Sequence, residues 1–205
     1  MPANDPFQRY DETDDANFYV QPRLVNHIDD SAIAATTALF REYLLAEGAI
    51  LDLMSSWVSH LPEEVSFSRV AGLGMNETEL RRNPQLTDYI VQNLNKQTQL
   101  PYSDASFDGG MVTVSVQYLT NPVAVYRDLA RVLRPGAPFL TVFSNRMFPT
   151  KAVAIWQSLD DQGHQKLVRS YYEQTGLFDR IEVLDCSPSQ WSDPLYVVVG
   201  YRKSN

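Results

Sequence analysis

The chain has few of the residues that disulfide, metal or redox chemistry uses. Among its 205 residues there is a single cysteine, Cys186, which cannot form a disulfide within the chain. The three histidines are scattered and do not have the spacing typical of metal ligands. We therefore predict no metal site, and we interpret Cys186 as a small apolar packing residue.

Long apolar runs are also missing. The longest runs are far shorter than the roughly 20 residues that span a bilayer, so we predict no membrane segment. The first residues contain no basic region followed by an apolar core, and such a region is what a secretory signal requires. These two features together predict a cytoplasmic protein.

Positive charge is scarce relative to negative charge. The chain carries 17 basic and 25 acidic side chains, a net charge of −8, and an isoelectric point of about 4.8. This balance disfavours a general affinity for nucleic acid or anionic lipid. We predict a small-molecule substrate, neutral or cationic, as the partner. The sequence does not indicate an oligomeric state.

The remaining composition is that of an ordinary globular domain. Hydrophobic residues make up 44% of the chain, aromatic residues 11% and charged residues 20%. Residues 1–27 are polar, acidic and interrupted by prolines, and they predict an N-terminal arm or lid whose aromatic end packs on the domain. Residues 28–205 are expected to form that domain.

Hydrophobic periodicity predicts alternating strands and helices along the domain. We expect strands at about 50–53, 68–73, 89–93, 109–119, 138–144, 180–184 and 196–201. We expect helices at about 29–47, 57–61, 76–83, 121–134 and 150–174, the last one broken or bent near Gly163. Alternation of this kind predicts an α/β fold with a mostly parallel sheet, helices on both faces and a ligand crevice at the carboxyl ends of the strands. The last two strands can add an antiparallel strand.

The stretch 49–61, AILDLMSSWVSHL, has the outline of a strand, a turn and a helix start. In nucleotide-binding α/β folds the turn after the first strand brings backbone N–H groups and a helix N-terminus to the ligand. Glycines usually permit that close approach, but this turn contains none. The fold is therefore easier to predict than the function.

The segment from residue 100, LPYSDASFDGGMVTVSVQYL, continues into a helix that ends in VLRPGAPF. It is similar to the loop, fourth strand, helix and start of the fifth strand in small-molecule methyltransferases of class I, which use S-adenosylmethionine. The resemblance covers about residues 45–203. It implies a Rossmann-like sandwich with a seven-stranded sheet, and S-adenosylmethionine as the cofactor.

The resemblance also implies where the cofactor is held, and this sequence departs from the family pattern there. Met54, Ser56 and Val58 replace three glycines of the first turn, and Gly74 replaces an acid that often binds the ribose hydroxyls. Asn93 stands where an aspartate commonly lies near the adenine amino group. The implied cofactor-binding residues are Asp52, Met54, Ser55, Ser56, Gly74, Met75, Asn76, Asn93, Leu94 and Ser115.

Candidate acceptor-site residues lie on the arm and after the fourth strand. An arm closes over the substrate in many small-molecule methyltransferases, which implies substrate-binding roles for Tyr19, Arg23 and Tyr118, the last expected to end the fourth strand. His27 and Tyr118 are the candidates for a catalytic role. The alternative is structural: Tyr19 packs, Arg23 pairs with a nearby acid and His27 precedes a helix cap.

Two functions from different classes follow. The first is an S-adenosylmethionine-dependent methyltransferase acting on a small molecule. The alternative is a catalytically inactive methyltransferase-like protein used for binding or assembly, which the replaced glycines and Gly74 favour. A dinucleotide oxidoreductase is disfavoured, because neither the GxGxxG pattern nor a ribose-binding acid is present.

Overall fold

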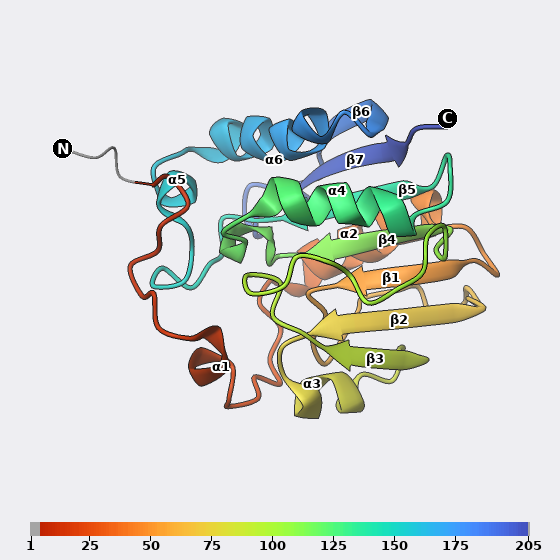
Figure 1. Cartoon of the computed structure of the whole chain (residues 1–205), viewed down its shortest axis with the longest axis horizontal. Helices are drawn as coiled ribbons and strands as arrows, with labels where there is room; N and C mark the ends of the chain where they lie inside the picture. Colours follow the sequence, from red (N-terminus) through yellow and green to blue (C-terminus); the bar gives the residue numbers. More distant parts are fainter. Residues whose placement is uncertain (1–4, 205) are drawn as a thin grey trace.

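The computed structural model describes residues 5–204 and contains one seven-stranded sheet (Figure 1). The order is β3-β2-β1-β4-β5-β7-β6; β1 to β5 are parallel, and β7 runs antiparallel to both of its neighbours. This arrangement confirms the predicted fold class. The strands are β1 (Ala49–Leu53), β2 (Arg69–Gly74), β3 (Asp88–Val91), β4 (Gly109–Thr113), β5 (Pro138–Phe143), β6 (Phe178–Asp185) and β7 (Tyr196–Arg202).

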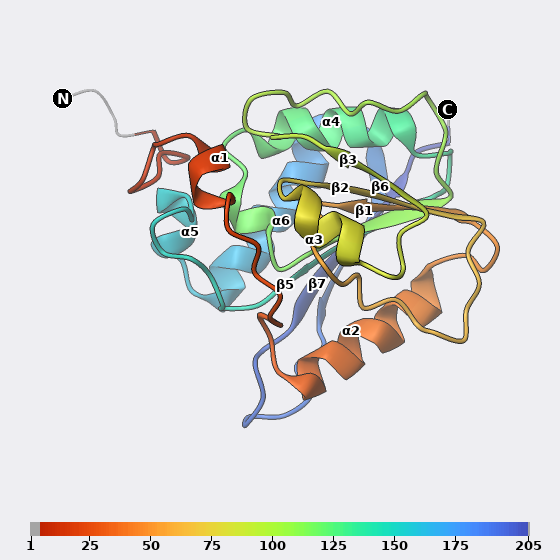
Figure 2. The ribbon, with the colours of Figure 1, turned by 90° about the horizontal axis from the view of Figure 1, so that it is seen from below.

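Helices cover both faces of the sheet (Figure 2). On one face pack α4 (Pro122–Val132) and α6 (Asp161–Thr175), and on the other packs α2 (Asp30–Tyr43). The remaining helices are short: α1 (Asp15–Phe18), α3 (Glu77–Arg82), α5 (Ala154–Gln157) and the 3-10 turn η1 (Val116–Tyr118). Within residues 5–204, no helix is long and apolar enough to cross a membrane.

Local sequence explains where the long helices begin and end. The Asp29 carboxylate accepts the N–H of Ala32 at 2.9 Å and caps α2. The Asp160 carboxylate accepts the N–H of Gly163 and caps α6, and Gly176, with φ of 69°, follows the last residue of that helix.

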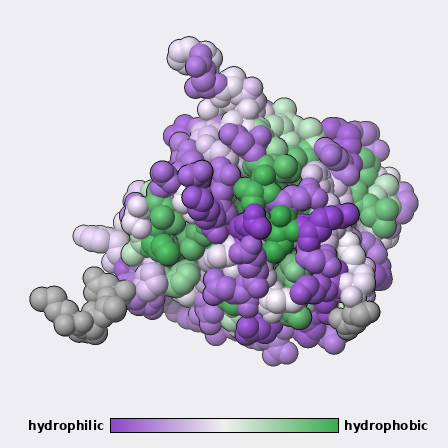
Figure 3. Space-filling model, turned by 90° about the horizontal axis from the view of Figure 1, so that it is seen from above, coloured by the Kyte–Doolittle hydropathy of each residue, from purple (hydrophilic) through white to green (hydrophobic). Residues whose placement is uncertain are grey.

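Seen from above, the surface carries polar side chains over most of its area with apolar patches between them (Figure 3).

Three expectations about elements were wrong. Residues 54–68 contain no helix, so the predicted helical turn at 57–61 is absent. The fourth strand ends at Thr113, and Tyr118 lies in η1 instead of at a strand end. The break or bend predicted near Gly163 is a break, and it lies earlier, at residues 158–160 between α5 and α6, because Asp160 caps a new helix there.

Candidate functional site

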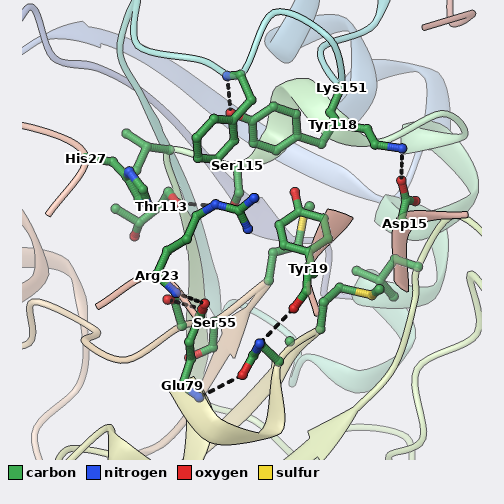
Figure 4. A pocket seen from close by; sticks show the side chains of 18 of the residues that line it. Asp15, Tyr19, Arg23, His27, Ser55, Glu79, Thr113, Ser115, Tyr118 and Lys151 are labelled. Carbon is green, nitrogen blue, oxygen red and sulfur yellow. Dashed lines mark hydrogen bonds and ion pairs between the residues drawn. The ribbon is translucent and has the colours of Figure 1, made fainter. Parts of the chain in front are cut away.

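A cavity of about 510 Å³ lies at the carboxyl ends of β1, β2 and β4, beneath the arm (Figure 4). Its floor includes Met54, Met75 and Ser115, each of which comes just after one of those strands. Parallel strands place their carboxyl ends at one edge of the sheet, and that edge is where such folds bind ligands. The arm supplies the other wall.

The cavity brings together nearly all the residues that the sequence predicted for cofactor and substrate. Tyr19, Arg23, His27 and Tyr118 line it. Nine of the ten predicted cofactor-binding residues also line it: Met54, Ser55, Ser56, Gly74, Met75, Asn76, Asn93, Leu94 and Ser115.

Asp52 is the exception. Its side chain is 3% exposed and accepts hydrogen bonds from Ser55 Oγ at 2.5 Å and Ser59 Oγ at 2.7 Å. Burial raises its pKa to about 6, although both hydroxyls act in the opposite direction. The carboxyl group therefore organises the turn after β1 and does not face the cavity.

The turn after β1 keeps a glycine-like backbone without glycine. Met54, at the first replaced glycine, has φ of 57°, which lies in the left-handed region. Ser55 N–H then donates to Leu73 O at 2.8 Å, so the turn folds against the end of β2. No helix follows, and the turn therefore presents no helix N-terminus to a ligand.

Gly74 is required by this packing. A Cβ atom at position 74 would lie 2.2 Å from the backbone oxygen of Ser55. Residue 74 can therefore carry no acidic side chain while the turn keeps this path. The two departures from the family pattern, in the first turn and at the ribose position, are one structural change.

Several polar groups at the base of the cavity already have protein partners. Asn76 Oδ1 caps α3 by accepting Glu79 N–H at 3.1 Å, and its Nδ2 donates to Tyr19 O at 2.7 Å. The Glu79 carboxylate accepts Ser56 Oγ at 2.6 Å and the backbone N–H of Arg23 at 2.6 Å. These contacts join the arm to α3.

The arm is also held by charges that sequence analysis did not identify. Asp15 accepts from Asn95 Nδ2 at 3.0 Å and more weakly from Asn93 Nδ2 at 3.4 Å. Arg9 Nη1 lies 2.6 Å from the Asp15 carboxylate, and the fully buried Lys151 pairs with the same group at 3.3 Å. A lysine in a loop gives no sequence signal of burial, because lysine is usually exposed.

The upper wall of the cavity is aromatic. The guanidinium carbon of Arg23 lies 4.3 Å from the ring centroid of Phe18 and 5.1 Å from that of Phe148. Tyr118 stacks on Phe148 at 5.9 Å, and its hydroxyl accepts Phe148 N–H at 2.8 Å. His27 packs edge-on to Phe148, and burial lowers its pKa, so the ring is neutral at neutral pH.

The comparison with protein families gives a match to the methyltransferase domain over residues 55–141. The matched segment includes the loop after β1, strands β2 to β4 and helix α4, and the cavity residues Ser55, Met75 and Ser115 lie within it. Over residues 55–141 the chain is therefore similar to methyltransferase domains.

Relatives of this methyltransferase-like chain match it in part. It is 33% identical to methyltransferase phqN of Penicillium fellutanum over 35% of this chain and 24% of that protein. It is 28% identical to the biotin biosynthesis bifunctional protein BioHC of Teredinibacter turnerae over 53% of this chain and 21% of that protein. The matched region is thus less than a quarter of the length of these curated relatives.

Solved structures share the fold of this methyltransferase-like chain at low identity. A chain from the complex of the Haloferax volcanii Trm112 methyltransferase activator with a putative methyltransferase aligns with a TM-score of 0.63. Its identity is 15%, over 86% of this chain and 91% of that one. A second match is phosphoethanolamine N-methyltransferase 2 of Haemonchus contortus in complex with S-adenosyl-L-methionine, with a TM-score of 0.61. Its identity is 12%, over 83% of this chain and 52% of that one.

Proposed function

We propose that the protein is an S-adenosylmethionine-dependent methyltransferase that acts on a small molecule. The observation that carries the proposal is the position of the cavity, at the strand ends where the fold binds ligands and among the residues for which the family resemblance implies cofactor binding. A cytoplasmic location remains a prediction from the sequence.

Three features support a fit to this cofactor. The cavity volume of about 510 Å³ falls in the range of small-molecule sites, roughly 300–1,000 Å³. The Thr113 hydroxyl lines the cavity, is buried and has no hydrogen-bond partner, so it can accept or donate to a polar ligand. Met54 retains the backbone conformation that glycine usually provides in the first turn.

The chain's own residues have limited work to do in such a reaction. S-adenosylmethionine supplies a methyl group already activated by a sulfonium, so the protein mainly aligns the two reactants. Met75 and Leu94 would pack on the adenine, and the arm would exclude water from above. His27, neutral at neutral pH, offers a ring nitrogen to accept a proton from a hydroxyl or ammonium acceptor.

Calorimetric titration with S-adenosylmethionine and S-adenosylhomocysteine tests the proposal. We expect saturable binding in the micromolar range and weaker binding of guanosine, which lacks the adenine amino group and the amino-acid tail. No detectable heat with either adenosyl ligand at millimolar concentration would contradict the proposal.

A second candidate is a methyltransferase-like binding protein without catalysis. The observation that favours it is internal pairing: the Ser55 and Ser56 hydroxyls and the Asn76 amide all bind protein groups instead of facing the cavity freely. This candidate predicts ligand binding with no methyl transfer. Incubation with radiolabelled S-adenosylmethionine and a protein-free cell extract separates the two, because a small molecule is then labelled only if the added protein is an enzyme.

A further inference from the structure

Arg23 differs from the other cationic side chains around the cavity. Its Nη2 donates to Phe18 O at 3.0 Å, but its Nη1 is buried and has no hydrogen-bond partner. Within residues 5–204 no carboxylate lies within ion-pair distance of this guanidinium. A buried guanidinium nitrogen without an acceptor is costly, and a ligand acceptor would remove that cost.

The neighbouring cations are already neutralised. Arg9 pairs with Asp15 at 2.6 Å, Lys151 pairs with Asp11 at 3.2 Å and Arg146 pairs with Asp193 at 2.6 Å. These ion pairs leave Arg23 as the unpaired positive charge on the wall of the cavity, so far as the described residues show. Figure 4 shows its guanidinium pointing into the space between Tyr19, Tyr118 and Ser115.

The surroundings of Arg23 favour a ligand with a flat apolar body. The guanidinium carbon of Arg23 lies 4.3 Å from the Phe18 centroid and 5.1 Å from the Phe148 centroid, and these two rings pack edge-to-face at 5.3 Å. Tyr118 and His27 extend the same aromatic wall through their contacts with Phe148. This wall is built by the arm, η1 and the loop after β5, whereas Met54, Gly74, Met75 and Asn93 come from the β1 to β3 side.

We infer that the cavity binds a small aromatic carboxylic acid, with its carboxylate on the Arg23 guanidinium and its ring against Phe148 and Tyr118. Naming this acid as the methyl acceptor rests on the proposed function, but its binding does not. The net charge of −8 favours a neutral or cationic substrate, yet a guanidinium in contact acts at a few ångströms while distant charges are screened. The local contact therefore determines the choice of ligand.

The first test uses the unmodified protein and two matched probes. Para-hydroxybenzoate carries the carboxylate, and para-hydroxybenzamide has the same shape without the charge. We expect the acid to bind at least about 10-fold more tightly than the amide. A hydrogen bond between a guanidinium and a carboxylate is stronger than one between a guanidinium and a neutral amide. Equal affinities, or no binding of the acid at millimolar concentration, would overturn the inference.

The second test changes the protein. Arg23→Gln is expected to weaken para-hydroxybenzoate binding about 10-fold and to leave para-hydroxybenzamide unchanged. Arg23→Lys keeps the charge but loses the planar fork, so it should retain part of the preference for the acid. Arg127→Gln, an equal loss of charge at an exposed position on α4, is the control and should bind both probes as the parent does.

The carboxylate that Arg23 binds could instead belong to the cofactor's amino-acid end. S-adenosylhomocysteine carries that carboxylate, and methylthioadenosine lacks it. If Arg23→Gln weakens S-adenosylhomocysteine alone and leaves both methylthioadenosine and para-hydroxybenzoate unchanged, Arg23 serves the cofactor and the inference is wrong. If para-hydroxybenzoate binds as expected while no adenosyl ligand does, the inference stands and the proposed methyl transfer fails.

Discussion

Asp52 is the residue whose environment departs most from that of an ordinary carboxyl group. It is buried behind the cavity, and burial raises its pKa from 3.8 to about 6. The folded protein therefore retains a proton that the unfolded chain releases above pH 3.8. Because the native state binds more protons than the unfolded state between about pH 4 and pH 6, this residue lowers stability as the pH rises through that window.

Asp52→Asn should remove this pH dependence, since the amide oxygen can still accept from Ser55 and Ser59 and carries no charge. As the pH rises from 4 to 7, we expect the free energy of unfolding of the variant to increase relative to that of the parent by up to about 3 kcal/mol. Guanidinium unfolding at several pH values measures the difference. A gap between the two proteins that is constant with pH would contradict the prediction.

The close packing around Gly74 predicts that any larger residue at this position destabilises the fold. Gly74→Ala places a Cβ 2.2 Å from the Ser55 backbone oxygen, which cannot move aside as a flexible side chain would. We expect a loss of about 2 kcal/mol or more in free energy of unfolding. Gly109→Ala is the matched control on a buried strand, because its nearest neighbour is a Leu44 methyl group at 3.2 Å. Equal losses in both variants would contradict the explanation.

For single residues, the sequence predicted which ones line the cavity but not which hydrogen-bond and ion-pair partners their side chains have. Residues that follow parallel strands gather at one edge, so Met54, Met75 and Asn93 could be placed in one cavity from periodicity and family likeness. The partners of Ser55 and the burial of Lys151 could not be predicted in this way. They depend on the path of a loop and an arm, which no short-range pattern specifies.

At the scale of elements, the absence of a helix after β1 has a physical cause in the side chains of the turn. Ser55 and Ser59 donate to Asp52, so their hydroxyls hold the chain in a compact irregular path. Serine and aspartate compete with helix formation through such local bonds. The apolar spacing of Trp57 and Leu61 suggested a helix, but the hydrogen bonds of the turn determine the conformation.

The arm is the second element whose position gives a prediction. Lys151 is fully buried and donates to Thr13 O at 2.8 Å, and it pairs with Asp11 and Asp15. Lys151→Met keeps the length of the side chain but removes these bonds. We expect the local opening of α1 to become easier by about 1–3 kcal/mol, which means roughly 5- to 150-fold faster hydrogen exchange there.

Hydrogen exchange followed by mass spectrometry reports this change for residues 15–19. Lys166→Met, an exposed position on α6, is the control and should leave α1 exchange as it is in the parent. Exchange of the core strands should stay slow in both variants, because the arm does not contribute to the sheet. Unchanged α1 exchange in Lys151→Met would show that the arm is held by its other contacts.

At the scale of the whole molecule, the two apolar cores share one sheet. Alternate residues of β1 serve different faces: Ile50 packs with α2, and Leu51 packs on the face of α4 and α6. β5 and β7 alternate in the same way. Loss of either core therefore exposes the strands of the other, so the domain should unfold as one unit.

A ligand that binds the cavity should consequently stabilise the entire domain. S-adenosylhomocysteine at 100 times its dissociation constant adds about 2.7 kcal/mol to the free energy of unfolding. For a chain of this size that corresponds to a rise in melting temperature of roughly 5–10 °C. Differential scanning calorimetry should show one transition that moves as a whole, while guanosine at the same concentration moves it little. A transition that splits, with only part of the heat absorption shifting, would mean that the cavity and the two cores unfold separately.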